Sequence, residues 1–248
     1  MDLIEIPASA GPAEAYVARP PVGQGAGVLF FMDAIGLRPQ IQEMVDRIAG
    51  WGYTVLAPNV FYREGRAEEL APKADLTEPG AREEFFKHAM PRVKALTSEK
   101  AEQDIPAYLT ALRGLPGVST TSVAATGYCM GARLAVRTAS ARPEDVAAAG
   151  GFHGGGLATD DDTSPHLGLG RARAEFAFGH ADQDRSMPPE AVGRLGEALS
   201  AAGLVFINDV YAGAPHGYTM ADTTMYREEA AERHYRVLQE LLDRTLKG

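Results

Sequence analysis

The feature that most constrains this fold is an apolar run of strand length, followed by an amphipathic helix and a second apolar run. Residues 25–32 (GAGVLFFM) carry no charged side chain, which is typical of a strand buried on both faces. Residues 38–52 then place apolar side chains on one helical face, and residues 53–58 (YTVLAP) form the next run. Those apolar positions are Ile41, Met44, Val45, Ile48 and Ala49. A strand, a helix and a strand in this order predict a parallel βαβ unit.

The same alternation continues to the C-terminus. The first twenty residues alternate as an antiparallel hairpin at the edge of a sheet. Further strands are predicted at residues 121–127, 146–153, 172–179 and 204–213, and further helices at residues 99–115, 130–141, 189–203 and 226–246. The sequence therefore predicts an α/β fold. We expect one domain over residues 1–248, with a mostly parallel, doubly wound sheet of about eight strands and helices on both faces.

Residues 61–98 interrupt this rhythm. The segment is polar, contains three prolines, and has short periodic stretches only around Phe85 and Phe86. It is predicted to be irregular cover with one or two short helices. Because loops carry function more often than the sheet they decorate, we expect this excursion to border the active site.

Charge and cysteine content exclude several classes of protein. The formal net charge is −9 and the isoelectric point is about 5.2, which disfavours nucleic acid and anionic membrane surfaces as partners. A single cysteine cannot form an internal disulfide, and no run of apolar residues is long enough to span a bilayer. No signal-peptide pattern opens the chain, so the cytoplasm is the expected compartment. The choice between monomer and homodimer stays open.

The only cysteine lies in the stretch GYCMG, between the predicted strand at residues 121–127 and the predicted helix at 130–141. This is the Gly-x-nucleophile-x-Gly pattern of a nucleophile elbow, in which a strand reverses sharply into a helix. The turn crowds the neighbouring backbone, so small residues are needed at Gly127 and Gly131. The helix N-terminus favours a thiolate on Cys129, and the amide of Met130 is placed to stabilise an oxyanion.

A thiol nucleophile needs a base, and the base needs an orienting acid. His216 follows a strand-like run and lies among small, turn-forming residues, which makes it the best candidate for the base. His153 and His180 also follow strand ends and are candidates for the pocket wall. Asp182 and Asp184 lie between the nucleophile and the base in the chain, and spacing alone does not choose between them. No metal-ligand spacing or cofactor motif occurs, so neither is expected.

Three segments, GYCMG, GHADQDRSMPPE and GAPHGY, resemble the dienelactone hydrolase family of the α/β-hydrolase superfamily, and the likeness extends over essentially the whole chain. Members of this family carry Asp-x-x-(Val/Met)-Pro at the catalytic acid, and DRSMP matches this pattern at Asp184. The resemblance implies that Ala34 supplies the second oxyanion amide. It also implies that the acidic residue beside it, Asp33, takes part in activating the thiol.

Two departures from the family pattern concern the substrate. The family binds its substrate's carboxylate with arginines, one of them four residues after the catalytic histidine, where this chain has Met220. Arg38 or Arg63 are candidates to replace it, with Tyr128 and His153 as further candidates for the pocket. Asp33 is one methylene shorter than the family's usual glutamate.

Together these patterns predict a cofactor-free cysteine hydrolase of small-molecule esters or lactones, of the carboxymethylenebutenolidase type, with a Cys129–Asp184–His216 triad and an acyl-enzyme intermediate. Two alternatives remain open. One is a general carboxylesterase or thioesterase that acts on neutral acyl groups. The other is a non-catalytic ligand-binding protein on the same scaffold.

Overall fold

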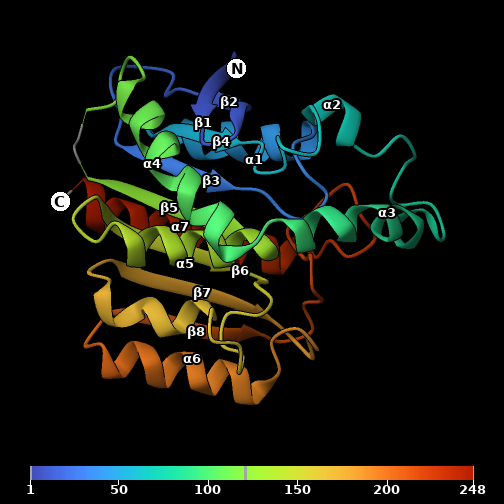
Figure 1. Ribbon diagram of the computed structural model, residues 1–248. Coiled ribbons are helices and arrows are strands. Elements are labelled where there is room, and N and C mark those ends of the chain that lie inside the picture. Colours follow the sequence, from blue (N-terminus) through green and yellow to red (C-terminus); the bar gives the residue numbers. More distant parts are fainter. Residues whose placement is uncertain (1, 120–121, 248) are drawn as a thin grey trace.

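The computed structural model describes residues 2–119 and 122–247, within which eight strands form one sheet (Figure 1). The strands are β1 (Asp2–Ala8), β2 (Gly11–Ala18), β3 (Gly27–Phe31), β4 (Thr54–Pro58), β5 (Val123–Tyr128), β6 (Val146–Phe152), β7 (Glu175–Ala181) and β8 (Phe206–Tyr211). Their order across the sheet is β1-β2-β4-β3-β5-β6-β7-β8. Strands β1, β2 and β4 pair antiparallel, and every pair from β4 to β8 is parallel. The predicted fold class is confirmed.

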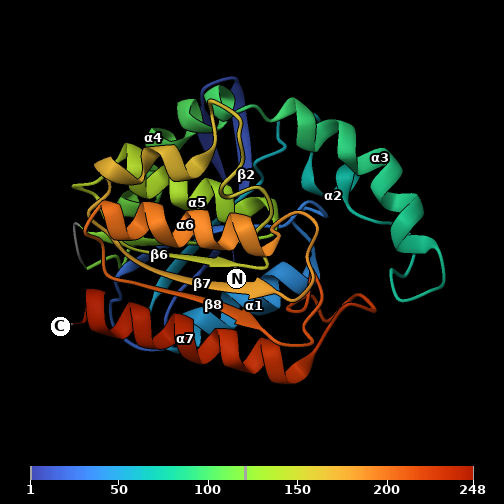
Figure 2. The same ribbon diagram turned by 90° about the horizontal axis from the view of Figure 1, so that it is seen from below.

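Helices cover both faces of this sheet. They are α1 (Pro39–Gly50), α2 (Ala67–Leu70), α3 (Ala81–Ala95), α4 (Ser98–Gly114), α5 (Met130–Ala141), α6 (Pro189–Ala201) and α7 (Glu228–Leu246), with a 3₁₀ helix at Pro165–Arg171. Figure 2 shows α4, α5 and α6 on one face of the sheet and α1 and α7 on the other, while α3 extends beyond its edge. Burial of the central strands β3, β4 and β5 between two helical layers explains why their sequences carry no charged side chain.

The predicted elements agree with the structure at most positions. Helix α1 buries the five predicted side chains, and α5 has the predicted bounds. The predicted hairpin is formed by β1 and β2, whose pairing runs from Asp2 opposite Val17 to Ala8 opposite Gly11. The strand predicted at residues 121–127 is β5, although residue 121 lies outside the described part of the chain.

The excursion at residues 61–98 is more regular than predicted. It contains the short helix α2, but α3 runs for 15 residues and continues through Pro91. The proline removes only one backbone donor, and the helix keeps its other hydrogen bonds on both sides of it. The prediction of short helices was therefore wrong for α3. The low apolar content of the sequence reflects a helix with few buried residues, namely Ala89 and Arg92.

The parallel strands determine where a site forms. Strands β3, β5, β6, β7 and β8 run in the same direction, so the loops that follow them meet at one edge of the sheet. These loops carry Asp33, Cys129, His153, Asp184 and His216. Within the described residues, the helices include none with the length and apolar character needed to cross a membrane.

Candidate active site

Cys129 occupies a strained turn between β5 and α5. Its backbone has φ 55° and ψ −118°, a conformation that non-glycine residues rarely adopt. The flanking glycines permit the turn. A Cβ on Gly127 would lie 2.0 Å from the carbonyl oxygen of Gly131, and a Cβ on Gly131 would lie 2.4 Å from the carbonyl oxygen of Phe31. The absence of side chains therefore lets the end of β3 approach the start of α5.

His216 and Asp184 form a hydrogen-bonded pair beside this turn. Nδ1 of His216 donates to Oδ2 of Asp184 at 2.6 Å. The other carboxylate oxygen of Asp184 accepts bonds from the backbone N–H and the hydroxyl of Ser186, at 2.8 and 2.7 Å. Asp182 instead accepts a bond from the backbone N–H of Gly213 at 2.9 Å. The structure thus brings Asp184, not Asp182, to the histidine.

The electrostatics of the site favour a thiolate–imidazolium pair. Burial by itself raises the pKa of Cys129, but the charge of His216, its hydrogen bond and the N–H of Met130 lower it, and the net shift is downward. Burial likewise lowers the pKa of His216, but Cys129 and Asp184 raise it to about 10. Both pKa shifts favour a proton on the imidazole rather than on the sulfur.

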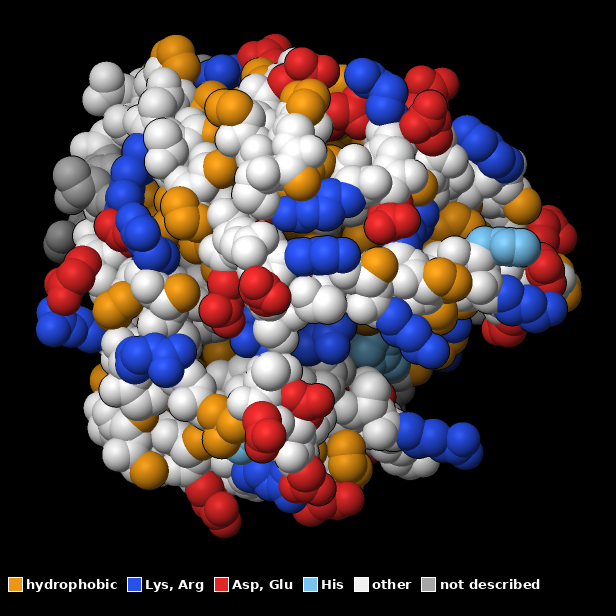
Figure 3. Space-filling view, viewed as in Figure 1, with side chains coloured by type: hydrophobic (Ala, Val, Ile, Leu, Met, Phe, Trp, Pro, Cys, Tyr) orange, Lys and Arg blue, Asp and Glu red, His pale blue; other side chains and the backbone are white. Residues whose placement is uncertain are grey.

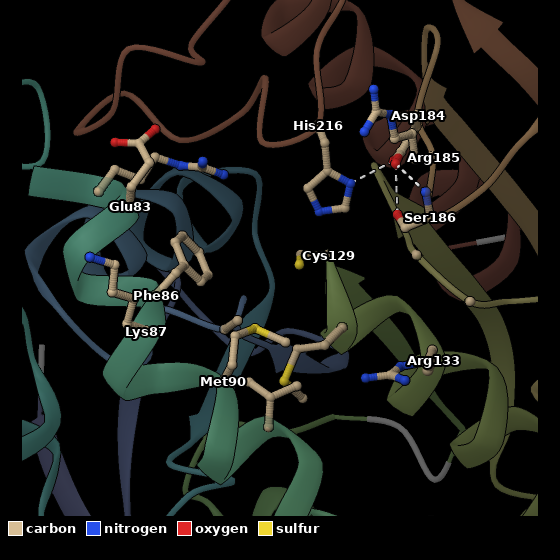
Figure 4. Close-up of a pocket in the computed structure, with 16 residues that line it drawn as sticks. Glu83, Phe86, Lys87, Met90, Cys129, Arg133, Asp184, Arg185, Ser186 and His216 are labelled. Carbon is tan, nitrogen blue, oxygen red and sulfur yellow. Dashed lines mark hydrogen bonds and ion pairs between the residues drawn. The ribbon is translucent and has the colours of Figure 1, made fainter. Parts of the chain in front are cut away.

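A cavity of about 870 Å³ opens above the cysteine, and Figure 4 shows His216 and Arg133 on opposite sides of the sulfur. Phe86, Met90 and Val93 of α3 form one wall of this cavity. Figure 3 shows the hollow on the surface beside α3. The backbone segment of Ala34 and the first residue of α5, Met130, border the cavity next to Cys129.

Asp33 and Arg38 belong to a buried ion-pair network. Arg38 is 3% exposed and its guanidinium donates to Asp33 at 2.7 and 3.1 Å and to Asp222 at 2.6 and 3.1 Å. It also contacts the sulfur of Met220 at 3.3 Å. Asp33 accepts from the N–H of Ile35 at 3.1 Å, and its charge raises the pKa of Cys129. This arrangement favours a structural role for Asp33 and does not support the expected role in activating the thiol.

The other pocket candidates have different outcomes. Arg38 is fully engaged by two aspartates, and Arg63 binds Asp104 at 2.6 Å and the hydroxyl of Ser9 at 2.7 Å. The idea that either supplies a guanidinium for a substrate carboxylate was therefore wrong. Asp33 is only five residues from Arg38, but Asp222 and Asp104 are distant in sequence from the arginines that they bind, which is why the sequence did not reveal these pairs.

Tyr128 stands behind the cavity, whereas His153 lines a small adjoining pocket together with Asp33, Cys129 and His216. The hydroxyl of Tyr128 bonds to Nε2 of His234 at 3.1 Å in the core, so its expected place in the pocket was wrong. His153 is also buried, and its Nε2 bonds to the hydroxyl of Thr219 at 2.8 Å. Its ring centroid lies 5.3 Å from that of His216, so His153 packs against the candidate base. His180 bonds to Asn208 at 2.7 Å, away from the cavity.

Several side chains of the site were not predicted. Ser186 holds Asp184, Asp222 holds Arg38, and the guanidinium groups of Arg82, Arg133 and Arg185 line the cavity. A sequence signal existed for Arg133 alone, because it follows Cys129 by four residues, the spacing of one helical turn. Over residues 2–119 and 122–247, no three His, Cys, Asp or Glu side chains are grouped to hold a metal ion.

The sheet order and the strained strand-to-helix turn at Cys129 define an α/β-hydrolase fold. The sequence matches the dienelactone hydrolase family over residues 13–246. The chain belongs to this family. Family membership confirms the predicted enzyme class, a hydrolase that acts on ester or lactone bonds.

Individual relatives are distant but extensive. A Synechocystis protein provisionally named carboxymethylenebutenolidase is 24% identical, over 99% of this chain and 97% of its own. Carboxymethylenebutenolidase 1 of Cupriavidus pinatubonensis is 29% identical over 60% of this chain and 59% of its own. The crystal structure of a Klebsiella pneumoniae protein, provisionally named dienelactone hydrolase, superposes with a TM-score of 0.81 at 23% identity. That superposition covers 97% of this chain and 96% of the other. At this identity the structural likeness shows the fold alone.

Proposed function

We propose that this protein is a cysteine-dependent hydrolase of small-molecule esters or lactones, in which Cys129, His216 and Asp184 act as nucleophile, base and orienting acid. The observation that carries the proposal is the His216–Asp184 pair, 2.6 Å apart, beside a cysteine whose pKa is lowered by the histidine. A structural cysteine buried among apolar side chains would have a raised pKa instead.

The reaction follows from this arrangement. The thiolate of Cys129 attacks the carbonyl carbon, and the backbone amides of Met130 and Ala34 hold the resulting oxyanion. The C–O bond to the leaving group breaks as the imidazolium of His216 gives its proton to the leaving oxygen, and a thioester remains on Cys129. His216 then takes a proton from water, the hydroxide attacks the thioester carbonyl, and the acid is released with the sulfur as leaving group.

Asp33 is left outside these steps. Its carboxylate is bound by Arg38 and by the backbone N–H of Ile35, so it holds the loop that carries Ala34. The residues after β3 reach Cys129 because Gly131 leaves room for the carbonyl groups of Phe31 and Met32. Asp33 and Gly131 together thus fix the position of the second oxyanion amide.

The proposal is tested by hydrolysis of 4-nitrophenyl acetate by the wild type and by Cys129→Ala. The variant should lose activity to the uncatalysed rate, because the nucleophile is gone. It should keep the wild-type circular dichroism spectrum and melting temperature, because only a thiol is replaced by a hydrogen, in the turn between β5 and α5. Activity retained by Cys129→Ala would exclude the nucleophile. A folded wild type with no activity on any activated ester would instead favour a ligand-binding protein on this scaffold.

A further inference from the structure

Cationic side chains gather around the cavity of a protein whose net charge is −9. Arg82, Arg133 and Arg185 all line the cavity that contains Cys129. Figure 3 shows lysine and arginine side chains around the hollow on this face of the molecule. Of the two carboxylates in the cavity wall, Asp184 is bound to His216, and Glu83 lies on the exposed side of α3. The cavity is therefore suited to an anionic ligand.

Among the arginines of the cavity, Arg133 is the one whose guanidinium is best suited to bind an anion. It is partly buried, and among the described residues it has no hydrogen bond or ion pair with any acceptor. Burial lowers its pKa, the charge of Cys129 opposes this shift, and the nearby charge of Arg137 has a smaller lowering effect. By contrast, Arg137 on the next turn of α5 pairs with Glu102 at 2.9 Å. A partly desolvated guanidinium that has no hydrogen-bonded counterion is costly even with the charge of Cys129 nearby, so an anion bound directly to Arg133 would stabilise the site.

The position of Arg133 indicates which part of the substrate carries that anion. Arg133 follows Cys129 by one helical turn, on the same side of α5. In Figure 4 its guanidinium lies on the opposite side of the sulfur from His216. The leaving oxygen has to face His216 to receive its proton, so the leaving group extends to that side. The acyl part of the substrate therefore extends toward Arg133.

We propose that Arg133 is a specificity-determining residue that binds a carboxylate carried on the acyl part of the substrate, so that monoesters of dicarboxylic acids are preferred. This inference rests on the proposed hydrolase function of Cys129. The planar guanidinium binds a carboxylate through two parallel hydrogen bonds, which also fixes the direction of the acyl chain. Arg185 is exposed and adjacent to Asp184, on the leaving-group side, where solvent weakens its attraction for an anion.

The test compares three chromogenic esters. They are the 4-nitrophenyl monoester of adipic acid, the neutral 4-nitrophenyl hexanoate, and the hexanoate of 3-carboxy-4-nitrophenol, which carries the carboxylate on its leaving group. The wild type should have the highest kcat/KM for the adipate monoester. Arg133→Gln should lower that value by roughly 10- to 100-fold and change the value for neutral hexanoate by less than about threefold. Arg133→Lys should restore part of the loss, since it keeps the charge but not the two parallel bonds.

The matched control is Arg137→Gln, which removes the same charge from the next turn of α5, outside the cavity. It should leave the preference for the adipate monoester unchanged. An equal loss in both variants would show a general field effect and overturn the inference, as would an adipate-to-hexanoate ratio that Arg133→Gln does not change. The inference would also be overturned if Arg133→Gln lowered kcat/KM only for the ester that carries its carboxylate on the leaving group. Absence of activity on all three esters would instead contradict the proposed hydrolase function itself, and this inference with it.

Discussion

At the scale of single residues, the site depends on which of two nearby aspartates binds His216. Asp184 and Asp182 are two positions apart, follow the same strand and are both aspartates. Only Asp184 reaches the imidazole, because Ser186 binds its other oxygen and turns the carboxylate toward His216. A carboxylate bound to the imidazole contributes more than its charge, since it also fixes the orientation and the tautomer of the ring.

Asp184→Asn should therefore lower kcat/KM for 4-nitrophenyl acetate by about 100-fold or more, because the amide cannot stabilise the imidazolium. The raised pKa of His216 should fall in this variant, since Asp184 contributes to raising it. The pH–rate profile and an NMR titration of His216 measure both effects. Asp182→Asn is the control, because Asp182 accepts a hydrogen bond from a backbone N–H, and the side-chain oxygen of asparagine can accept the same bond. A comparable loss in both variants would refute the assignment of Asp184.

At the scale of elements, the network around Arg38 joins two loops. Asp33 lies in the loop after β3, which carries Ala34, and Asp222 lies in the loop after His216. Arg38 lies between them, just before α1, with its side chain 2% exposed. A charge buried to this extent persists only because two carboxylates surround it. The loop of the oxyanion amide and the loop of the catalytic base are thereby held against each other.

Arg38→Met should destabilise the protein by about 3 kcal/mol, because it leaves a buried aspartate unpaired, and should lower kcat about tenfold as the loop of Ala34 relaxes. Chemical denaturation and steady-state kinetics measure the two effects. Arg47→Gln is the matched control, since its pair with Glu232 is 41% exposed on both sides and should contribute less than about 1 kcal/mol. If kcat of Arg38→Met equalled that of the wild type, the network would have no positioning role.

The elements also show what the sequence was able to predict. The stripe of α1 and the bounds of α5 followed from periodicity, since the same residues that define the pattern are the ones buried. Helix α3 was underestimated because it buries few side chains and contains Pro91. The pairs of Arg38 with Asp222 and of Arg63 with Asp104 were not predictable, since these residues lie 184 and 41 positions apart. Such pairings depend on the folded chain and leave no local signal.

At the scale of the whole molecule, stability and chemistry are located in different places. The core lies between the sheet and its two helical layers, whereas the candidate catalytic side chains lie on loops at one edge of the sheet. Helix α7 shows the separation clearly. It packs on β5, β6 and β7, and its Leu238 is fully buried. The Cδ1 atom of Leu238 lies so close to Gly150 of β6 that a Cβ added to this glycine would be 3.2 Å from it.

Leu238→Ala should thus destabilise the fold by about 2–5 kcal/mol and lower the melting temperature, because it opens a cavity in the core. At a temperature where the variant is folded, kcat/KM should stay within about threefold of the wild type. Leu3→Ala, at a site that is 56% exposed, should have little effect on either quantity. A fully folded Leu238→Ala without activity would show that the core and the site are not separate.

The central claim is that Cys129 is held as a thiolate by protonated His216, and the most direct measurement is the rate of alkylation by iodoacetamide as a function of pH. Cys129 is the only cysteine of the chain, so the label reports on it alone. Its pKa is lowered, so the thiolate is present above that lowered value and is lost as the pH falls through it. The account predicts fast alkylation with a midpoint below the usual value of about 8–9, and a rate that falls as the pH falls through that midpoint. It also predicts that His216→Gln moves the midpoint upward. An inert thiol, or a midpoint at the usual 8–9 that His216→Gln leaves unchanged, would contradict the account.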